Sequence, residues 1–268
     1  MHRPLTQSDL FPHGPLRRLG RRVELFSEID STNAYLLAHA AHLEDGTVAV
    51  AEFQTAGRGR QGRRWLAPRG SSILLSVLLV EPEGSLCITH ATMLGAVAAA
   101  EAIEIETDCR PGLRWPNDLV AGGRKLGGIL AESTPRPNSA VPERGVVIGI
   151  GLNCLQQAGH FTGELAQRAT SLEIECSQPV DRHALAGRLI ERLDAYLADE
   201  ADQARRRARF HAALIARCED LGARITLLES SCRYSGTVLE IADNGELVVQ
   251  LDSGVRRRFE PTTTTRLW

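Results

Sequence analysis

Hydrophobic residues follow different patterns in the two parts of the chain. Up to about residue 219, short apolar runs alternate with longer segments of helical period, such as the Ala-rich residues 89–105, which predict a helix packed closely on a sheet. From Leu221 onward only short runs with strand-like alternation remain, and Asn244-Gly245 between two of them is a strong hairpin signal. The pattern predicts an α+β domain with a mixed β-sheet and helices, followed by a small β domain.

Strand-like runs indicate where the sheets lie. Residues 73–80 (ILLSVLLV) are apolar on both faces, which is typical of a buried central strand or of a strand covered by a partner subunit. The other strands expected in the larger domain are residues 23–29, 47–53 and 145–153. The strands expected in the small domain are residues 224–228, 234–241, 247–251 and 256–259.

Length and composition agree with this division. The 268 residues suit one substantial domain and one small domain, and a hydrophobic content of 43% is ordinary for a globular protein with a full core. Residues 1–22 are rich in Pro, Arg and His, which predicts a flexible lead-in. We therefore expect the larger domain at residues 23–219 and the small domain at residues 220–268.

Charge and cysteine content argue against several protein classes. The net charge of −2 gives no general attraction to nucleic acid. Six cysteines lie far apart with no C-x-x-C pair, so we expect reduced thiols and neither a disulfide framework nor a zinc site. The sequence shows no apolar leader and no run that approaches a membrane-spanning length, so the expected location is the cytoplasm.

The most unusual local chemistry lies in residues 57–65, which read GRGRQGRRW. Three glycines allow close folding over a ligand, and four arginines supply forked donors that suit phosphates and carboxylates. No Asp or Glu occurs from Phe53 to Val80, so the local field is positive. Single-strand nucleic-acid binders use similar segments, and a solvated turn is also possible. Because strands are expected on both sides, we interpret the segment as a loop of a folded domain, mobile when empty and ordered by an anion.

Three further segments carry polar groups at the ends of expected elements. Ser31 to Asn33 either simply cap a helix or present donors at its N-terminus to a buried polar ligand. Asn117 and Asp118 follow Pro116 in a turn, and form either an ordinary Asn-Asp turn or a carboxylate and amide directed at a nucleotide and its magnesium. Lys125 opens a buried-looking strand, where a charge without a partner is costly, unless it lies at an exposed edge.

Together these segments resemble the biotin-protein ligase family. The resemblance rests on five blocks in the family's order, namely STN (31–33), AEFQTAGRGRQGRRW (51–65), RWPND (114–118), KLGGIL (125–130) and GIGLN (149–153). It extends from Ser31 to the C-terminus and implies a catalytic domain like those of class II aminoacyl-tRNA synthetases and biotin synthetases, with a C-terminal SH3-like β-barrel. Residues 1–22 leave no room for the helix-turn-helix repressor domain of bifunctional members. We therefore expect the monofunctional type, which does not bind operator DNA.

The resemblance also implies an activity and a set of site residues. The expected reaction is ATP-dependent attachment of biotin to a lysine through biotinyl-5′-AMP. The implied catalytic residues are Lys125, Arg60 and Asp118. The implied biotin-binding residues are Ser31, Thr32, Asn33, Gln54, Gly57, Arg58, Arg60, Lys125, Gly127 and Gly128. The implied ATP- and adenylate-binding residues are Arg58, Arg60, Arg63, Trp65, Asn117, Asp118, Lys125 and Asn153.

The same resemblance implies the substrates and the partner. ATP enters with magnesium near Asp118, biotin is a substrate, and neither a protein metal cage nor a tightly bound prosthetic group is expected. The partner is a biotin carboxyl carrier protein of a carboxylase, no membrane is involved, and the chain acts as a monomer or a homodimer. Two segments depart from the family. Leu155, Gln156 and Gln157 stand where some relatives have a nucleotide-contacting Arg, and residues 259–268 (FEPTTTTRLW) replace a Gly-Glu-Val-containing segment.

Two other functions remain open at this point. A lipoate-protein ligase has the same fold, but its pocket takes an apolar dithiolane acid and it lacks the GRGRxGRxW loop. A non-enzymatic RNA-binding module could use the Arg/Gly loop and the barrel, but it leaves RWPND, KLGGIL and GIGLN without a role.

Overall fold

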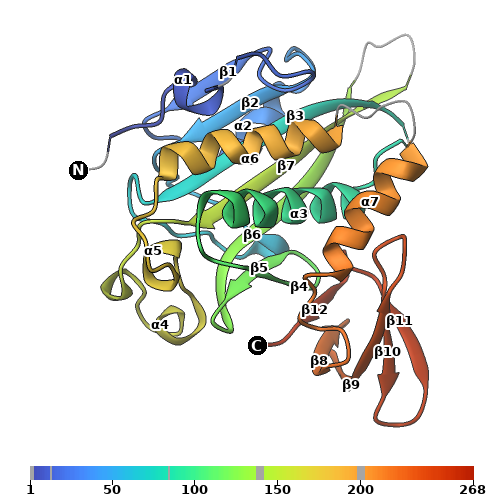
Figure 1. Ribbon diagram of the computed structural model, residues 1–268. Coiled ribbons are helices and arrows are strands. Elements are labelled where there is room, and N and C mark those ends of the chain that lie inside the picture. The colour runs from blue at the N-terminus through green and yellow to red at the C-terminus, as the bar shows by residue number, and fades with distance from the viewer. Residues whose placement is uncertain (1–2, 13, 84, 137–141, 198–202) are drawn as a thin grey trace.

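The larger part of the molecule is built on a seven-stranded mixed sheet (Figure 1). The computed structural model describes residues 3–12, 14–83, 85–136, 142–197 and 203–268. The strand order is β1-β2-β3-β7-β6-β5-β4, with β1 and β2 parallel and the other neighbours antiparallel. The strands are β1 (Val23–Phe26), β2 (Thr47–Ala51), β3 (Ser72–Pro82), β4 (Gly112–Arg114), β5 (Asp118–Ala121), β6 (Arg124–Arg136) and β7 (Glu143–Asn153). This arrangement confirms the expected α+β class.

The apolar strand β3 lies inside the sheet, paired with β2 on one side and β7 on the other. Its pairing with β7 runs from Ser72 opposite Asn153 to Pro82 opposite Glu143. Nearly all of its residues are buried within the chain, which explains why its sequence is apolar on both faces.

Helices cover both faces of the sheet. On one face, α3 (Ile88–Glu106) packs on β6 and β7, and α6 (Arg182–Leu197) lies beside it (Figure 1). On the other face, α2 (Thr32–His39) packs on β3 and β7. A Cβ at Gly95 would lie 2.9 Å from Ile148 Cγ2, so the small residues of α3 do permit the expected close packing. The remaining helices are α1 (Gln7–Leu10), η1 (Arg60–Gly62), η2 (Ala158–His160), α4 (Leu165–Arg168), α5 (Leu172–Glu175) and α7 (Gln203–Ile215).

Helix α3 corrects the expectation that no segment approaches membrane-spanning length. By length and composition alone its 19 residues could cross a membrane. In the structure 67% of that segment is buried, against the sheet and against α6 and α7. Its apolar character therefore belongs to the core of the domain.

The expectation of a flexible lead-in at residues 1–22 is wrong for the residues that the structure describes. Leu5, Leu10 and Leu19 are buried in the main core. The Asp194 carboxylate on α6 accepts backbone N–H bonds at three successive positions, and the Arg18 guanidinium forms ion pairs with two carboxylates. The Pro, Arg and His content of the segment gave no sign of this packing, because three widely spaced leucines are enough to anchor it.

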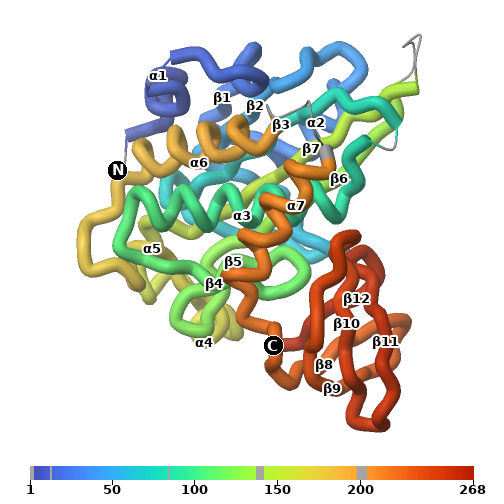
Figure 2. The backbone as a smooth tube through the Cα atoms, turned by 45° about the vertical axis from the view of Figure 1, so that its right-hand side comes forward, coloured from blue at the N-terminus to red at the C-terminus, as the bar shows by residue number. Residues whose placement is uncertain are grey.

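The C-terminal part forms a separate lobe beside α7 and β4 (Figure 2). It is a five-stranded antiparallel sheet in the order β11-β10-β9-β8-β12, which confirms the small β domain. Its strands are β8 (Arg224–Glu229), β9 (Cys232–Ile241), β10 (Leu247–Leu251), β11 (Arg256–Phe259) and β12 (Thr264–Arg266). The first four match the expected strands. The fifth was not expected, because it lies in the segment that departs from the family pattern.

Two hydrogen bonds from Trp115 attach the lobe to the larger domain. Its backbone N–H donates to the buried Asp220 carboxylate at 2.8 Å, and its indole Nε1 donates to the carbonyl of Gly245 at 3.0 Å. The apolar side chains of both parts also form one continuous core. The lobe is thereby held next to the turn at residues 116–118, where polar site residues were expected.

Candidate functional site

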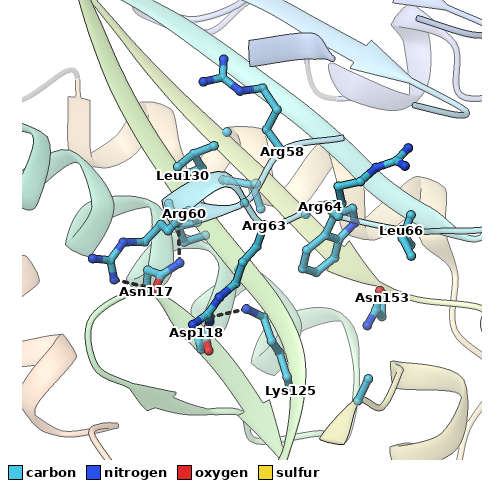
Figure 3. A pocket seen from close by; sticks show the side chains of 18 of the residues that line it. Arg58, Arg60, Arg63, Arg64, Leu66, Asn117, Asp118, Lys125, Leu130 and Asn153 are labelled. Atoms are coloured by element: carbon cyan, nitrogen blue, oxygen red, sulfur yellow. Dashed lines mark hydrogen bonds and ion pairs between the residues drawn. The ribbon is translucent and has the colours of Figure 1, made fainter. Parts of the chain in front are cut away.

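A cavity of about 500 Å³ opens on the α2 face of the larger sheet. The loop at residues 57–65 lies over it, and the turn before β5, the start of β6 and the C-terminal tail contribute to its walls (Figure 3). Of the residues implied by the family resemblance, it is lined by Ser31, Thr32, Asn33, Gln54, Arg58, Arg60, Arg63, Trp65, Asn117, Asp118, Lys125, Gly128 and Asn153. Gly57 and Gly127 do not line it.

Buried polar side chains form one end of the cavity. Ser31 caps α2, and its Oγ accepts the N–H of Ala34 at 3.4 Å. The backbone N–H of Thr32 donates to Gln54 Oε1 at 2.8 Å, and Thr32 Oγ1 lies 2.7 Å from Ser76 Oγ. Ser31 and Thr32 are almost inaccessible to bulk solvent. Ser31 thus caps α2 and lines the cavity at the same time, so capping does not exclude contact with a ligand.

Ser76 is a member of this network that sequence reasoning missed. Its hydroxyl donates to Asn33 Oδ1 at 2.7 Å, so the proton between Ser76 and Thr32 comes from Thr32, whose Oγ1 also has Gln54 Oε1 as an acceptor at 3.1 Å. The signal was present in the sequence, since Ser76 is the one polar residue of the run ILLSVLLV. A buried hydroxyl inside an otherwise apolar strand requires a partner.

Asn33 links this polar end to β6 and β7. Its Nδ2 donates to the carbonyl of Leu130 and to Glu132 Oε2, both at 3.0 Å. A Cβ at Gly149 would lie 2.0 Å from Asn33 Oδ1, so this side chain fits only because Gly149 has none. The first Gly of the GIGLN block therefore makes room for Asn33.

A charged pair occupies the centre of the cavity. Lys125 Nζ donates to Asp118 Oδ1 at 2.5 Å (Figure 3). The Lys125 side chain is 31% exposed. The charge that looked costly in a buried strand thus has its partner in the neighbouring strand. Asn117 holds the preceding turn, since its Nδ2 donates to the carbonyl of Ile129 at 2.9 Å and its Oδ1 accepts from Arg60 Nη1 at 3.3 Å.

The loop arginines differ in what they contact. Arg58 forms an ion pair with Glu132 at 2.6 Å, and Arg60 donates to the carbonyls of Pro261 and Thr264 in the small domain. Burial lowers the pKa of the Arg60 guanidinium, while the charge of Asp118 opposes that shift. Arg63 forms no hydrogen bond or ion pair with the described residues, and it points toward Asp118 and Lys125 (Figure 3).

Trp65 lies flat on two glycines of the sheet. A Cβ at Gly151 would be 2.7 Å from Trp65 Cε2, and one at Gly128 would be 3.5 Å from Trp65 Cζ3. The indole Nε1 is buried without a hydrogen-bond partner among the described residues. The glycines thus make room for the indole ring, and Lys125 Nζ lies 5.8 Å from the ring centroid.

The other two glycines have structural roles. A Cβ at Gly57 would lie 2.6 Å from the carbonyl oxygen of Trp65, so Gly57 allows the loop to close on itself. A Cβ at Gly127 would lie 2.9 Å from the carbonyl oxygen of Gly151, on the face of β6 turned away from the cavity. The biotin contacts that the resemblance implies for these two glycines remain predictions.

Asn153 lines the cavity with its amide already occupied. Its Nδ2 donates to the carbonyl of Thr170 at 2.9 Å, and its Oδ1 accepts from Gln156 Nε2 at 3.0 Å. Gln156 is fully buried, so one of the three positions where some relatives place an Arg has an internal role here. Another wall comes from residues that sequence reasoning did not identify, namely Phe161, Glu164, Leu165 and Arg168.

The C-terminal tail completes the cavity. Thr265 Oγ1 donates to Gln61 of the loop at 2.5 Å, and Arg266 pairs with Asp220 at 2.7 Å. The ring of Trp268 stacks on the Arg114 guanidinium at 4.3 Å. No contact of this tail was expected, because its sequence gives no familiar motif.

Sequence comparison finds relatives that are biotin ligases or ligase/repressors. The model of the biotin/lipoate A/B protein ligase family matches residues 25–153. The biotin–[acetyl-CoA-carboxylase] ligase of Mycobacterium tuberculosis is 36% identical over 247 residues, which cover 88% of this chain and 85% of that protein. The bifunctional ligase/repressor BirA of Escherichia coli is 34% identical over 178 residues, covering 66% of this chain and 54% of that protein. The chain thus spans about half the length of the ligase/repressor relatives.

Solved structures share the fold. The biotin protein ligase from Aquifex aeolicus in complex with biotin and ATP superposes with a TM-score of 0.72 at 23% identity, covering 92% of this chain and all of that one (100%). The biotin protein ligase from Leishmania major in complex with biotinyl-5-AMP has a TM-score of 0.57 at 19% identity, with 90% and 99% of the two chains covered.

Proposed function

The chain belongs to the biotin protein ligase family, and we propose that it uses ATP to attach biotin to a lysine of a carrier protein through biotinyl-5′-AMP. One observation carries the proposal. A single cavity joins a buried polar end, a central lysine–carboxylate pair and an arginine-rich loop with an indole ring. The polar end suits a polar ring, the lysine–carboxylate pair suits an acid, and the loop suits a nucleotide, so the three parts can hold them side by side.

The polar end suits a cyclic urea. Ser31 Oγ accepts from the backbone, so its own proton is available to donate to a ligand carbonyl. Thr32 Oγ1 donates to Ser76, so its free lone pair can accept a ligand N–H. The urea ring of biotin offers one carbonyl and two N–H groups, whereas Leu74 and Leu130 supply apolar wall for its remaining ring and chain.

The same end disfavours lipoate. A dithiolane ring would leave the buried Ser31 hydroxyl proton without an acceptor, and an unpaired buried polar group costs about 1–3 kcal/mol. The matched family model includes both biotin and lipoate ligases, so this polar network is the feature that favours biotin. The RNA-binding alternative leaves the network without a role.

In the first step the biotin carboxylate attacks the α-phosphorus of ATP. A carboxylate–phosphate bond forms, the bond to the β-phosphate oxygen breaks, and pyrophosphate leaves. Negative groups must approach each other, so fixed cations lower the barrier. Lys125 is held at this point by Asp118, and Arg63 points toward the pair. Magnesium would enter as part of the ATP substrate, and the carboxylate of Asp118 would be the group that holds it.

In the second step the neutral amine of the carrier lysine attacks the acyl carbon, and AMP leaves. Trp65 and the loop cover the cavity, so the mixed anhydride is shielded from water until that amine arrives. Beyond charge, the protein contributes alignment of groups that are already bound.

The partner is a carrier domain of a biotin-dependent carboxylase, and we propose the cytoplasm as the compartment. All six cysteines are free thiols in the structure, which fits a reducing compartment. A monomer or a homodimer remains the expected assembly.

ATP–pyrophosphate exchange tests the proposed function. Labelled pyrophosphate should enter ATP when biotin is added, and not with lipoate or without an acid. Exchange with lipoate at a comparable rate would make the protein a lipoate ligase. Absence of exchange with either acid would refute adenylation at this site.

A further inference from the structure

Glu132 on β6 joins the polar end of the cavity to the arginine-rich loop. Its Oε1 accepts from Arg58 Nη2 at 2.6 Å, and its Oε2 accepts from Asn33 Nδ2 at 3.0 Å. The loop and its flanks contain no acid from Phe53 to Val80, so a carboxylate for the loop must come from elsewhere in the chain. Glu132 supplies it from a distant strand.

Behind Glu132 the contacts continue without interruption. Asn33 Oδ1 accepts from Ser76, Ser76 accepts from Thr32, and the backbone of Thr32 donates to Gln54. Ser76 gives its one proton to Asn33, and Thr32 has one proton for two acceptors, Ser76 Oγ and Gln54 Oε1. A change in orientation at Thr32 or Asn33 is therefore passed on to Glu132.

The ion pair itself contributes little to the stability of the fold. The Arg58 side chain is 44% exposed, and exposed pairs contribute about 0–1 kcal/mol. The ion pair instead restrains the conformation of the loop. Arg58 is the first charged residue of the loop and lies between Gly57 and Gly59, whose backbones are costly to order. Fixing Arg58 therefore restrains the start of the loop at residues 57–65.

We propose that Glu132 is a positioning residue that couples occupation of the polar end to closure of the loop. The inference rests on the proposed function. A ligand bonded to Ser31 and Thr32 restrains Asn33, Asn33 restrains Glu132, and Glu132 holds Arg58 so that the loop closes. Without the carboxylate, biotin still binds, but the loop no longer responds to it.

Glu132→Gln tests the coupling, because it keeps the size of the side chain and removes the charge. Glu28→Gln is the matched control, since Glu28 forms an ion pair with Arg69 in the same basic segment and does not line the cavity. We would measure trypsin cleavage after residues 58–64, with and without biotin and ATP, together with the release rate of biotinyl-5′-AMP and the KM for biotin.

In the wild-type protein and in Glu28→Gln, biotin plus ATP should slow cleavage. In Glu132→Gln that protection should be lost, and the adenylate should leave about fivefold faster. Fivefold corresponds to the upper end of the free energy that a partly exposed ion pair contributes. The KM for biotin and the Tm should not change. Equal protection in Glu132→Gln and the wild-type protein would overturn the coupling. Tighter ATP binding in Glu132→Gln would also overturn it, by showing that Glu132 competes with the ligand for Arg58.

A second variant keeps the test decisive if Glu132→Gln folds poorly. Arg58→Gln removes the same ion pair from its exposed side, and it must give the same loss of protection; retained protection would refute the coupling. A wild-type protein that forms no adenylate at all would instead refute the proposed function, so the two failures are distinguishable.

Discussion

Removal of Lys125 should separate catalysis from folding. Lys125→Ala deletes the cation that lies 2.5 Å from Asp118 in the centre of the site. With 31% of the side chain exposed, the pair contributes less than about 1 kcal/mol to stability. In a chain of this size that corresponds to a fall in Tm of less than about 4 °C.

The expected loss in adenylation is much larger. A fixed cation that meets charge developing in the transition state is worth about 100-fold in rate or more, which is ~2.7 kcal/mol. Biotin affinity should change little, because the polar end of the cavity is untouched. The assay is biotin-dependent ATP–pyrophosphate exchange, with Tm measured by calorimetry on the same samples.

Arg124→Ala is the matched control. Arg124 is the neighbouring residue on β6, forms an ion pair with Glu175 at 2.7 Å, has a similar exposure of 35%, and does not line the cavity. It should lose as little stability as Lys125→Ala and keep its activity. Near-normal exchange in Lys125→Ala, or an equal loss in both variants, would refute the role assigned to Lys125.

Three further changes test other parts of the account. Gly149→Ala should lower stability by about 1–3 kcal/mol through its clash with Asn33, while Gly159→Ala, with open space around it, should not; equal melting temperatures would contradict the packing. Arg60→Gly should release activated biotin, seen as indiscriminate lysine labelling by mass spectrometry, and labelling as selective as in the wild-type protein would contradict this role. Burial raises the pKa of Cys154 to about 12. Iodoacetamide at pH 8 should therefore leave Cys154 unmodified while the exposed Cys87 reacts. Modification of both thiols at the same rate would show that Cys154 is accessible.

The sequence predicted those parts of the structure that depend on local pattern. The run ILLSVLLV became the buried strand β3, and Asn244-Gly245 joins β9 and β10 as expected. The motif residues converge because they lie at the ends of elements of one sheet. Local pattern is enough there, since apolar spacing and turn chemistry act within a few residues.

What the sequence did not show depends on contacts between distant segments. Glu132 looks like an ordinary strand residue until β6 brings it to Arg58, which is 74 positions away. The role of Gly151 appears only when Trp65 packs on it, and the C-terminal tail meets Gln61 across 204 positions. No periodicity or turn signal encodes such pairings, because they are set by the tertiary arrangement.

Single-turnover transfer from a preformed complex tests the central claim most directly. The protein would be incubated with biotin and α-labelled ATP, freed of excess nucleotide, and mixed with an apo carrier domain that contains its acceptor lysine. The proposed function predicts that biotinyl-5′-AMP is isolated with the protein, and that carrier addition releases labelled AMP while one carrier lysine gains biotin. Absence of a retained adenylate, or AMP release without biotin on the carrier, would contradict the account.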